Sequence, residues 1–264
     1  MRSMGEVPLS HPRYNSLMGR KLLTEAAADG LLADSALIAH GRGEAYDYLL
    51  GEATCESARA AITQSAHLIK QAKRCVISVN GNAVALAAAD LIRCAAVLQC
   101  PIEINIYYRT PERMTALNSR LEKVRREVGE EEAPTGWKGN WQTAVSDVVI
   151  LGVNPDSRIP NLEGPRANCC SDGILNADVI FVPLEDGDRC EALVEMGKKM
   201  IVVDLNPLSR TAKRATVTIV DELMRMAPIL LFDLINEESN TPNEWDNKTN
   251  LDNSLAVMLN FLEK

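Results

Sequence analysis

Residues 177–214, ADVIFVPLEDGDRCEALVEMGKKMIVVDLNPLSRTAKR, carry the clearest structural signal in this chain. Apolar runs at 178–184 and 200–205 predict two strands, and residues 190–199 have the apolar spacing of a helix between them. Strand, helix and strand in this order form a βαβ unit, whose right-handed crossover makes the two strands parallel. Both strands then end at one edge of a sheet, which is where open α/β sheets bind ligands.

The same pattern extends over most of the chain. Further apolar runs near residues 76, 103, 148 and 216 predict strands, with helical segments between them. We therefore expect an α/β fold with a doubly wound, mostly parallel, Rossmann-like sheet and N-terminal helices packed against it. The expected segments are an N-terminal helical part at 1–70, the α/β core at 71–236, and a polar loop with a C-terminal helix at 237–264, all in one compact domain.

The amino-acid composition limits the function. The net charge of −8 argues against a general binder of nucleic acid or of anionic membranes, although it allows a phosphorylated metabolite to bind where arginines gather. We see no signal peptide and no apolar run long enough to span a bilayer, so we expect a cytoplasmic protein. The seven cysteines lack zinc-type spacing, which favours reduced, packed thiols over a metal or redox site.

One stretch lies outside the regular pattern. Residues 129–143 are rich in Gly and Glu and predict an exposed connection. We expect Trp137 and Trp141 to dock on the surface or on a partner subunit.

The turn Asn80-Gly81-Asn82 follows one predicted strand and precedes an almost wholly apolar helix at 83–98. A helix that is apolar on nearly every side is a buried one, and its N-terminus favours an anion. The turn therefore predicts an anion site, with an ordinary β–α turn as the alternative. It has neither the GxGxxG pattern of dinucleotide-binding folds nor the Gly-Lys-Ser/Thr ending of a P-loop.

Arginines gather near the predicted turns. Two glycines flank Arg42, which predicts a loop whose backbone comes close to a ligand while the guanidinium binds an anion; an ordinary turn fits equally. Arg20 lies in a predicted helix at 16–30, where a solvated surface charge is the alternative. The pattern suits two phosphorylated or carboxylated ligands held together, and the other arginines that share it are Arg13, Arg109, Arg189 and Arg210.

Acidic residues also follow the predicted strands. Asp186 and Asp188 flank Gly187, and Asp204 opens the next loop. Acids at such positions commonly bind a ribose hydroxyl or Mg²⁺, although turn formation alone explains them too. His40 is a weak acid–base candidate, and no Ser-His-Asp or Cys-His arrangement stands out. The residues therefore favour phosphoryl or nucleotidyl transfer over nucleophilic catalysis by the protein.

Six motifs resemble the archaeal 4-phosphopantoate–β-alanine ligase family, also called phosphopantothenate synthetase. The resemblance spans residues 11 to about 225 and leaves out 129–143 and the tail beyond 237. The motifs are HPRYNSL (11–17), IAHGRGEAYDYLLGE (38–52), ISVNGN (77–82), INIYYRTPER (104–113), FVPLEDGDRCEALVEMGKK (181–199) and DLNPLSRTA (204–212).

The resemblance implies a homodimeric cytoplasmic enzyme of coenzyme A biosynthesis. It implies that (R)-4-phosphopantoate and β-alanine are joined with Mg²⁺ and ATP, through an acyl-adenylate, to give 4′-phosphopantothenate, AMP and pyrophosphate. The alternatives are an NAD(P)-dependent oxidoreductase, which the missing GxGxxG disfavours, a non-catalytic ATP sensor, and a kinase that would release ADP.

The resemblance also implies roles by motif position, while the metal ligands stay unassigned. Catalytic roles fall to His40, Arg42, Arg189 and Arg210. The ATP site would comprise Arg20, Arg42, Asp186, Gly187, Asp188, Arg189, Asp204, Leu205 and Asn206. Phosphopantoate would lie near Asn80, Asn82 and Arg109, together with Arg13.

Overall fold

A computed structural model describes residues 7–236 and 244–263 and contains one large parallel sheet. Its six strands lie in the order β3-β2-β1-β6-β7-β8, and every neighbouring pair is parallel. From β1 the chain adds β2 and β3 on one side of the sheet, and from β6 it adds β7 and β8 on the other side. This confirms the doubly wound fold. The strands are β1 (Cys75–Val79), β2 (Ile102–Ile104), β3 (Ile150–Leu151), β6 (Val179–Pro183), β7 (Lys199–Val203) and β8 (Val217–Ile219).

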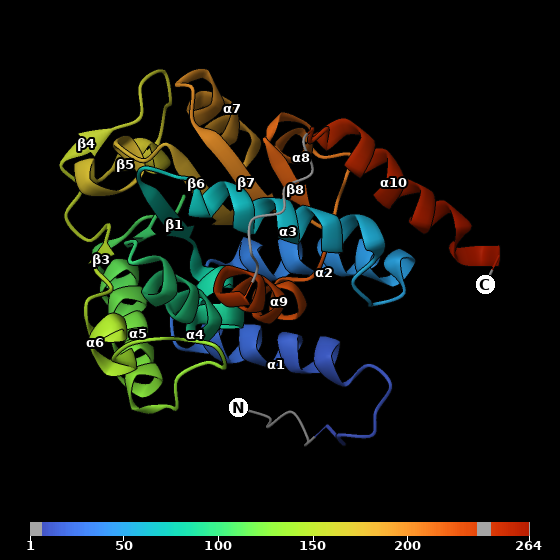
Figure 1. The fold of residues 1–264 in the computed structure, drawn as a ribbon, viewed down its shortest axis with the longest axis horizontal. Coiled ribbons are helices and arrows are strands. Elements are labelled where there is room, and N and C mark those ends of the chain that lie inside the picture. Colours follow the sequence, from blue (N-terminus) through green and yellow to red (C-terminus); the bar gives the residue numbers. More distant parts are fainter. Residues whose placement is uncertain (1–6, 237–243, 264) are drawn as a thin grey trace.

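Helices cover both faces of the sheet, as Figure 1 shows. Because side chains alternate along a strand, Ile77 and Val79 of β1 enter the larger apolar core, whereas Val76 enters the smaller one. The larger core is closed by α1 (Tyr14–Ala28), α3 (Glu56–Lys70), α4 (Gly81–Leu98), α5 (Pro111–Glu130), α6 (Trp141–Ser146) and α9 (Leu223–Asn236).

The smaller core lies on the opposite face and is closed mainly by α7 (Gly187–Glu195). A short antiparallel pair, β4 (Ser157–Arg158) and β5 (Asn168–Cys169), covers the rest of this face together with the turns Pro165–Ala167 and Ser171–Leu175. A third apolar cluster joins α2 (Asp34–Leu50), α8 (Arg210–Arg214) and α10 (Asn247–Leu259) at the β8 side of the sheet. The final turn is Asn260–Glu263.

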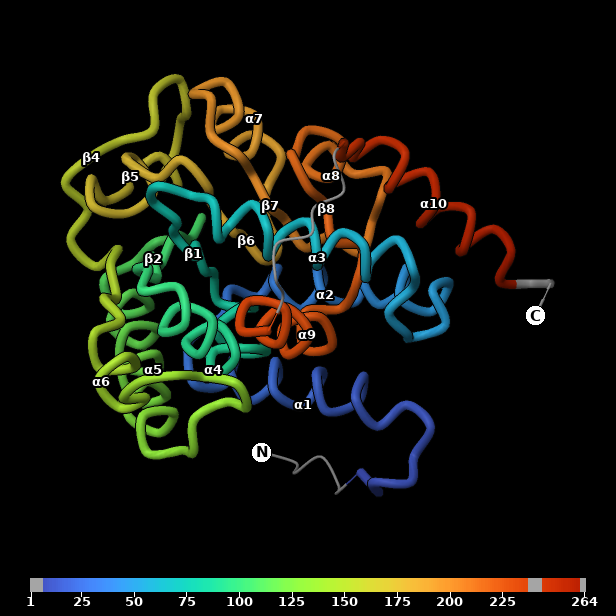
Figure 2. Tube along the Cα trace, in the orientation of Figure 1, coloured from blue at the N-terminus to red at the C-terminus, as the bar shows by residue number. Residues whose placement is uncertain are grey.

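The N-terminal helices pack against the α/β core, as expected, and the tube in Figure 2 shows α9 beside α3 and α4. The boundaries of the expected segments at residues 70 and 236 stay a prediction. Part of the expected polar loop, residues 237–243, lies outside the described residues.

Helix α4 corrects the expectation that the chain has no segment able to span a bilayer. Residues Gly81–Leu98 are long and apolar enough by length and composition, but 67% of this window is buried inside the protein. The helix packs against β1, α5 and α9. Its apolar surface is therefore explained by its place in the core.

Helix α2 corrects the expected loop around Arg42. The segment Gly41-Arg42-Gly43 lies inside a continuous helix, although each glycine costs a helix roughly 1 kcal/mol relative to alanine. Packing explains one of the two glycines, because a Cβ on Gly43 would lie 3.3 Å from Cδ1 of Leu205. Arg42 is therefore held by a helix and not by a flexible loop.

The stretch 129–143 is also more ordered than expected. Trp141 begins α6 and is only 6% exposed, and its Nε1 donates a 3.1 Å hydrogen bond to the carbonyl oxygen of Val128. Trp137 packs edge-on against it, with 5.7 Å between the ring centroids. Trp141 therefore belongs to the core of the domain.

Candidate active site

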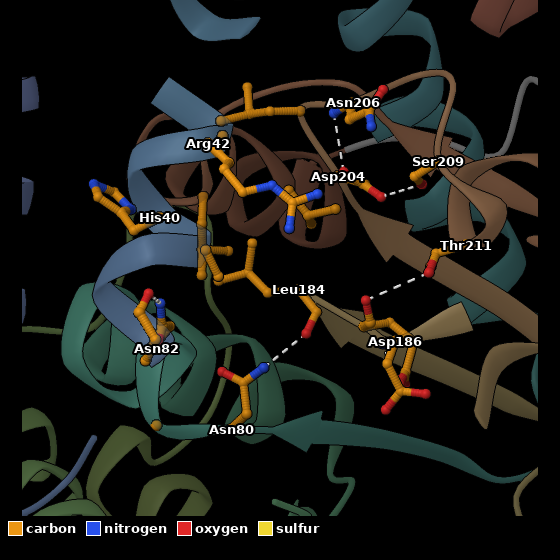
Figure 3. A pocket seen from close by; sticks show the side chains of 18 of the residues that line it. His40, Arg42, Asn80, Asn82, Leu184, Asp186, Asp204, Asn206, Ser209 and Thr211 are labelled. Carbon is orange, nitrogen blue, oxygen red and sulfur yellow. Dashed lines mark hydrogen bonds between the residues drawn. The ribbon is translucent and has the colours of Figure 1, made fainter. Parts of the chain in front are cut away.

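A cavity of about 750 Å³ opens at the carboxyl edge of the sheet, beside the ends of β1, β6 and β7. It lies where the winding of the sheet reverses between β1 and β6, which is the usual ligand position in doubly wound folds. Helix α2 closes it from the opposite side, as Figure 3 shows. The sequence-predicted residues that line it are His40, Arg42, Asn80, Asn82, Asp186, Gly187, Asp204, Leu205, Asn206 and Arg210.

Asn80 fixes the floor of this cavity. Its Oδ1 accepts a 3.0 Å hydrogen bond from the backbone N–H of Ala83 and so caps α4, and its Nδ2 donates a 2.7 Å hydrogen bond to the carbonyl oxygen of Leu184. Gly81 is required here, because a Cβ would lie 2.6 Å from the carbonyl oxygen of Leu31. The positive N-terminus of a buried helix therefore faces the cavity, as the sequence predicted.

Helix α2 contributes a free cation. In Figure 3 the guanidinium of Arg42 points from α2 into the space between Leu184 and Asp204. Within residues 7–236 and 244–263, no group accepts a hydrogen bond from it. Asn82 holds α2 against α4 by donating a 3.2 Å hydrogen bond to the carbonyl oxygen of Ala36. Arg42 is thus available to an anionic ligand.

His40 lies two residues before Arg42 and also lines the cavity. Its Nε2 is buried, lies 3.9 Å from the Glu44 carboxylate, and has no hydrogen-bond partner in the described part of the chain. Burial lowers the pKa of His40, against the opposing effect of Glu44. The imidazole is therefore neutral near pH 7 and can accept a proton.

Two acidic residues stand at the ends of β6 and β7. Asp186 caps α7 by accepting a 2.9 Å hydrogen bond from the N–H of Arg189. Burial raises the pKa of Asp186, but the guanidinium of Arg166 and this N–H outweigh burial and lower it overall. Asp204 accepts hydrogen bonds from the Ser209 hydroxyl and from the N–H of Asn206, and burial raises its pKa. Both carboxylates are thus held in fixed positions.

At the rim, Arg210 forms an ion pair with Asp188. Both side chains are more than half exposed, so this pair can open at little cost. Arg210 lines the main cavity, whereas Asp188 lines an adjoining recess.

Besides Asp188, four predicted site residues of the described part of the chain do not line the cavity, and a ligand contact by these five residues stays a prediction. Each has protein partners instead. Arg13 binds Glu52 at 2.9 Å, Arg20 binds Glu44 at 2.8 Å, Arg109 donates to the carbonyl oxygens of Gly152 and Val153, and Arg189 pairs with Glu185 and donates to the Ser78 hydroxyl. Arg189 is fully buried, so its charge supports the site from within the protein.

Arg166 also lines the cavity, although it is not among the site residues predicted from the sequence. This side chain is 8% exposed and forms ion pairs with Asp186 and, at 3.3 Å, with Glu185. Its Nε also donates a 3.2 Å hydrogen bond to Oδ1 of Asn105. Arg166 lies in an irregular stretch without periodicity, so no local pattern indicated that it turns inward.

Arg113 and Tyr107 were missed as well, although the motif at 104–113 contains both. Arg113 donates to the carbonyl oxygens of Tyr108 and, at 3.1 Å, of Leu31. Only their position in the motif at 104–113 could have identified Tyr107 and Arg113 as site residues from the sequence.

The arrangement suits polyanionic ligands. Four arginines and a helix N-terminus supply positive charge around a space of a size typical for small-molecule sites. The described residues contain no group of three or more His, Cys, Asp or Glu side chains that could hold a metal ion. Mg²⁺ often binds through one or two carboxylates and substrate phosphates, so a nucleotide could bring it to this site.

Comparisons with known proteins identify the family of this chain. A family model described as phosphopantothenate/pantothenate synthetase matches residues 57–260. A 4-phosphopantoate–beta-alanine ligase from Thermococcus onnurineus is 44% identical over 225 residues, which cover 85% of this chain and 78% of that protein. Ligases of the same name from Thermococcus kodakarensis and Methanospirillum hungatei are 45% and 43% identical, over 85% and 83% of this chain and 78% and 81% of theirs. The chain therefore belongs to the phosphopantothenate/pantothenate synthetase family.

Proposed function

We propose that this chain is an ATP-dependent ligase that joins 4-phosphopantoate to β-alanine and yields 4′-phosphopantothenate, a step of coenzyme A biosynthesis. The observation that carries this proposal is the cavity at the switch point of the sheet, built largely from residues in the family motifs. Relatives that are 41–45% identical are named 4-phosphopantoate–beta-alanine ligases.

The proposed reaction needs no covalent bond between the protein and its substrates. A carboxylate is a poor acyl donor, so it first attacks the α-phosphate of ATP, releases pyrophosphate and forms an acyl-adenylate. The amine of β-alanine then attacks the acyl carbon, and AMP leaves. Such an enzyme must position two anions and stabilise the developing negative charge, which suits arginines and a helix N-terminus.

We assign these tasks by position in the cavity. The N-terminus of α4, with Asn80 and Asn82, would bind the phosphate of phosphopantoate, because backbone N–H groups point toward the cavity there. Asp204 and Asn206 would hold the nucleotide at the end of β7, where ribose-binding acids commonly lie in such folds. Arg42 stands between the two groups and would contact the reacting phosphate.

Mg²⁺ would supply charge neutralisation on the ATP phosphates. Asp186 and Asp188 are both engaged by arginines, and the described residues offer no preformed cage for the ion. We place the enzyme in the cytoplasm, as the family resemblance implies.

We further propose a homodimer. The outward side of α2 carries exposed apolar residues, namely Leu37, Ile38, Ala45, Tyr48 and Leu49. Their spacing places them along one side of the helix, and such a stripe on a surface helix usually marks an interface.

Product analysis tests the proposed reaction. Purified protein would be incubated with ATP, Mg²⁺, 4-phosphopantoate and β-alanine, and nucleotides and acyl products separated by chromatography. We expect AMP and 4′-phosphopantothenate in equal amounts, and only when all substrates are present. Release of ADP would replace the acyl-adenylate by an acyl-phosphate, and no turnover by folded protein would favour a non-catalytic nucleotide-binding role.

A further inference from the structure

A second, smaller recess adjoins the main cavity. It has a volume of about 140 Å³, roughly that of five water molecules in the liquid, and lies between α1, α2 and the start of α9. His40, Leu205 and Glu222 line both spaces and form the junction between them. The remaining walls are Asn15, Ser16, Gly19, Glu44, Asp47, Met224 and Arg225.

The recess and the main cavity differ in their balance of charged side chains. Four arginines and five carboxylates line the main cavity, whereas three carboxylates and one arginine line the recess. Two of these three carboxylates are neutralised, because Glu44 pairs with Arg20 at 2.8 Å and Asp47 pairs with Arg225 at 2.6 Å. The third, Glu222, accepts a 3.1 Å hydrogen bond from the backbone N–H of Arg225, and no side-chain cation of the described residues bonds to it.

The carboxylate of Glu222 and the imidazole of His40 both stand at the junction between the two spaces. Burial raises the pKa of Glu222, so a cation bound beside this group would favour its charged form. Burial lowers the pKa of His40, so its neutral imidazole can accept a hydrogen bond. His40 Nε2 is closed off from solvent and has no hydrogen-bond partner in the described part of the chain. A small cation with N–H groups would satisfy both side chains.

We propose that this recess binds the amine substrate, an ω-amino carboxylate of the size of β-alanine, with its ammonium at Glu222 and His40 and its carboxylate toward Asn15 on α1. The inference rests on the proposed ligase function and assigns its second substrate a site. The ammonium then lies at the mouth of the space where the acyl-adenylate forms. The two anionic substrates occupy the main cavity, which four arginines line.

His40 takes a proton in the transfer step. The ammonium gives one proton to Nε2, and the resulting amine attacks the acyl carbon. The C–N bond forms, the bond from that carbon to the phosphate oxygen breaks, and AMP leaves with the electron pair. The amide nitrogen releases its second proton to solvent as the tetrahedral centre collapses.

A rival site exists on the other side of the main cavity. That recess is also acidic, and of its carboxylates Asp188 and Glu191 are paired with Arg210 and Arg214, whereas Glu163 and Glu195 have no ion pair among the described residues; it differs from the proposed site because no histidine lines it. Its exposed Glu195 serves as the matched control, because Glu195→Gln removes the same charge there.

Separate half-reactions test the proposal. In Glu222→Gln we expect the KM for β-alanine to rise about tenfold or more, as loss of a charge-assisted contact does. The KM for ATP and the exchange of pyrophosphate into ATP, driven by phosphopantoate without any amine, should stay near wild type. Glu195→Gln should leave all three unchanged. An unchanged KM for β-alanine in Glu222→Gln, or a higher one in Glu195→Gln, would overturn the proposal.

A pH profile tests the base. The charged groups around His40 are Glu44 and Asp47 on α2, Arg20 on α1, and Glu222 and Arg225 at the start of α9. In the wild type, kcat/KM for β-alanine should rise with pH as His40 loses its proton, and His40→Gln should lower it about a hundredfold and remove that rise. Pyrophosphate exchange should persist. An identical profile in the variant would contradict a proton-accepting role.

These outcomes also separate the inference from the function on which it rests. If the wild type neither exchanges pyrophosphate nor makes 4′-phosphopantothenate, the ligase proposal itself fails. If the wild type does both and the Glu222 and His40 variants match it, only the amine site is wrong.

Discussion

The side-chain amide of Asn80 donates a 2.7 Å hydrogen bond to the backbone carbonyl oxygen of Leu184 and so joins the ends of β1 and β6, the two strands between which the sheet reverses its winding. The same side chain caps α4. One residue thus ties the floor of the cavity to the helix that supplies its positive end. Leu184 itself adopts a positive φ of 62°, which is uncommon for a non-glycine residue and shows how tightly the chain turns there.

Replacing Asn80 by alanine should affect both stability and activity. Asn80→Ala removes a helix cap and the contact with Leu184, which together should cost about 1–2 kcal/mol in the free energy of unfolding, measured by urea denaturation. We expect a parallel loss of ligase activity, since the strand ends are no longer joined. Asn140 caps the short α6 in the same way, so Asn140→Ala should cost stability alone. Equal activity in both variants would contradict a role for Asn80 in the site.

Replacing Arg42 should lower activity with almost no effect on stability. It is exposed on α2 and has no hydrogen-bond acceptor in the described part of the chain, so Arg42→Ala should change the free energy of unfolding by less than about 0.5 kcal/mol. Turnover should fall about a hundredfold to a thousandfold, as when a charge-stabilising group is removed from an active site. Arg126→Ala, at an exposed position of α5, is the control for loss of one surface arginine. Turnover close to wild type in Arg42→Ala would refute the assignment.

The sequence predicted the sheet well and the arginines poorly, for a physical reason. Apolar runs such as 178–184 and 200–205 report burial on both sides of a strand, which local sequence contains. The direction of an arginine depends on partners far along the chain. Arg189 is buried against Glu185 and Ser78, whereas Arg166 turns into the cavity. Neither outcome can be read from neighbouring residues.

The error at Gly41-Arg42-Gly43 has a related cause. The two glycines predict a flexible backbone that comes close to a ligand, and glycine also lowers helix propensity. Tertiary packing decides instead, because α2 lies against α10 and against the loop after β7, where Gly43 leaves room for Leu205. By contrast, Asn80-Gly81-Asn82 was placed correctly, since a strand end followed by an apolar helix defines such a turn locally.

Charge on the outward side of α2 should dissociate the proposed dimer. Ile38 is 69% exposed in the single chain, so Ile38→Asp should not disturb the core of the monomer. We expect the wild type to have the mass of two chains by light scattering after size-exclusion chromatography, and the variant the mass of one. The control is Phe232→Asp, because Phe232 is 61% exposed on α9, away from the proposed interface. Dissociation by Phe232→Asp, and not by Ile38→Asp, would place the interface elsewhere.

Glu103 should make the stability of this protein depend on pH in an unusual direction. It is fully buried in β2 and accepts hydrogen bonds from the backbone N–H groups of Cys170 at 3.0 Å and Ile174 at 2.7 Å. These two bonds favour the charged form, but burial outweighs them and raises the pKa of Glu103 from 4.5 to about 7. The folded protein therefore holds a proton that the unfolded chain has already lost over this range.

The sign of the effect follows from proton linkage. A carboxyl group with a raised pKa in the folded state stabilises the fold fully below its unfolded pKa, and that contribution is lost as pH rises through the folded pKa. For Glu103 the window runs from pH 4.5 to just above 7, and the loss amounts to about 3 kcal/mol at most. Residues with lowered pKa values, such as Asp186, act in the opposite direction and at lower pH.

A pair of variants isolates this contribution. Glu103→Gln cannot ionise, so the difference in unfolding free energy between wild type and variant should shrink or reverse as pH rises from 5 to 8, measured by urea denaturation at each pH. Glu127 is exposed on α5, and Glu127→Gln should run parallel to the wild type over the same range. A difference that is constant with pH for Glu103→Gln would mean that the two backbone N–H groups hold Glu103 charged in the folded protein, and that burial does not dominate its titration.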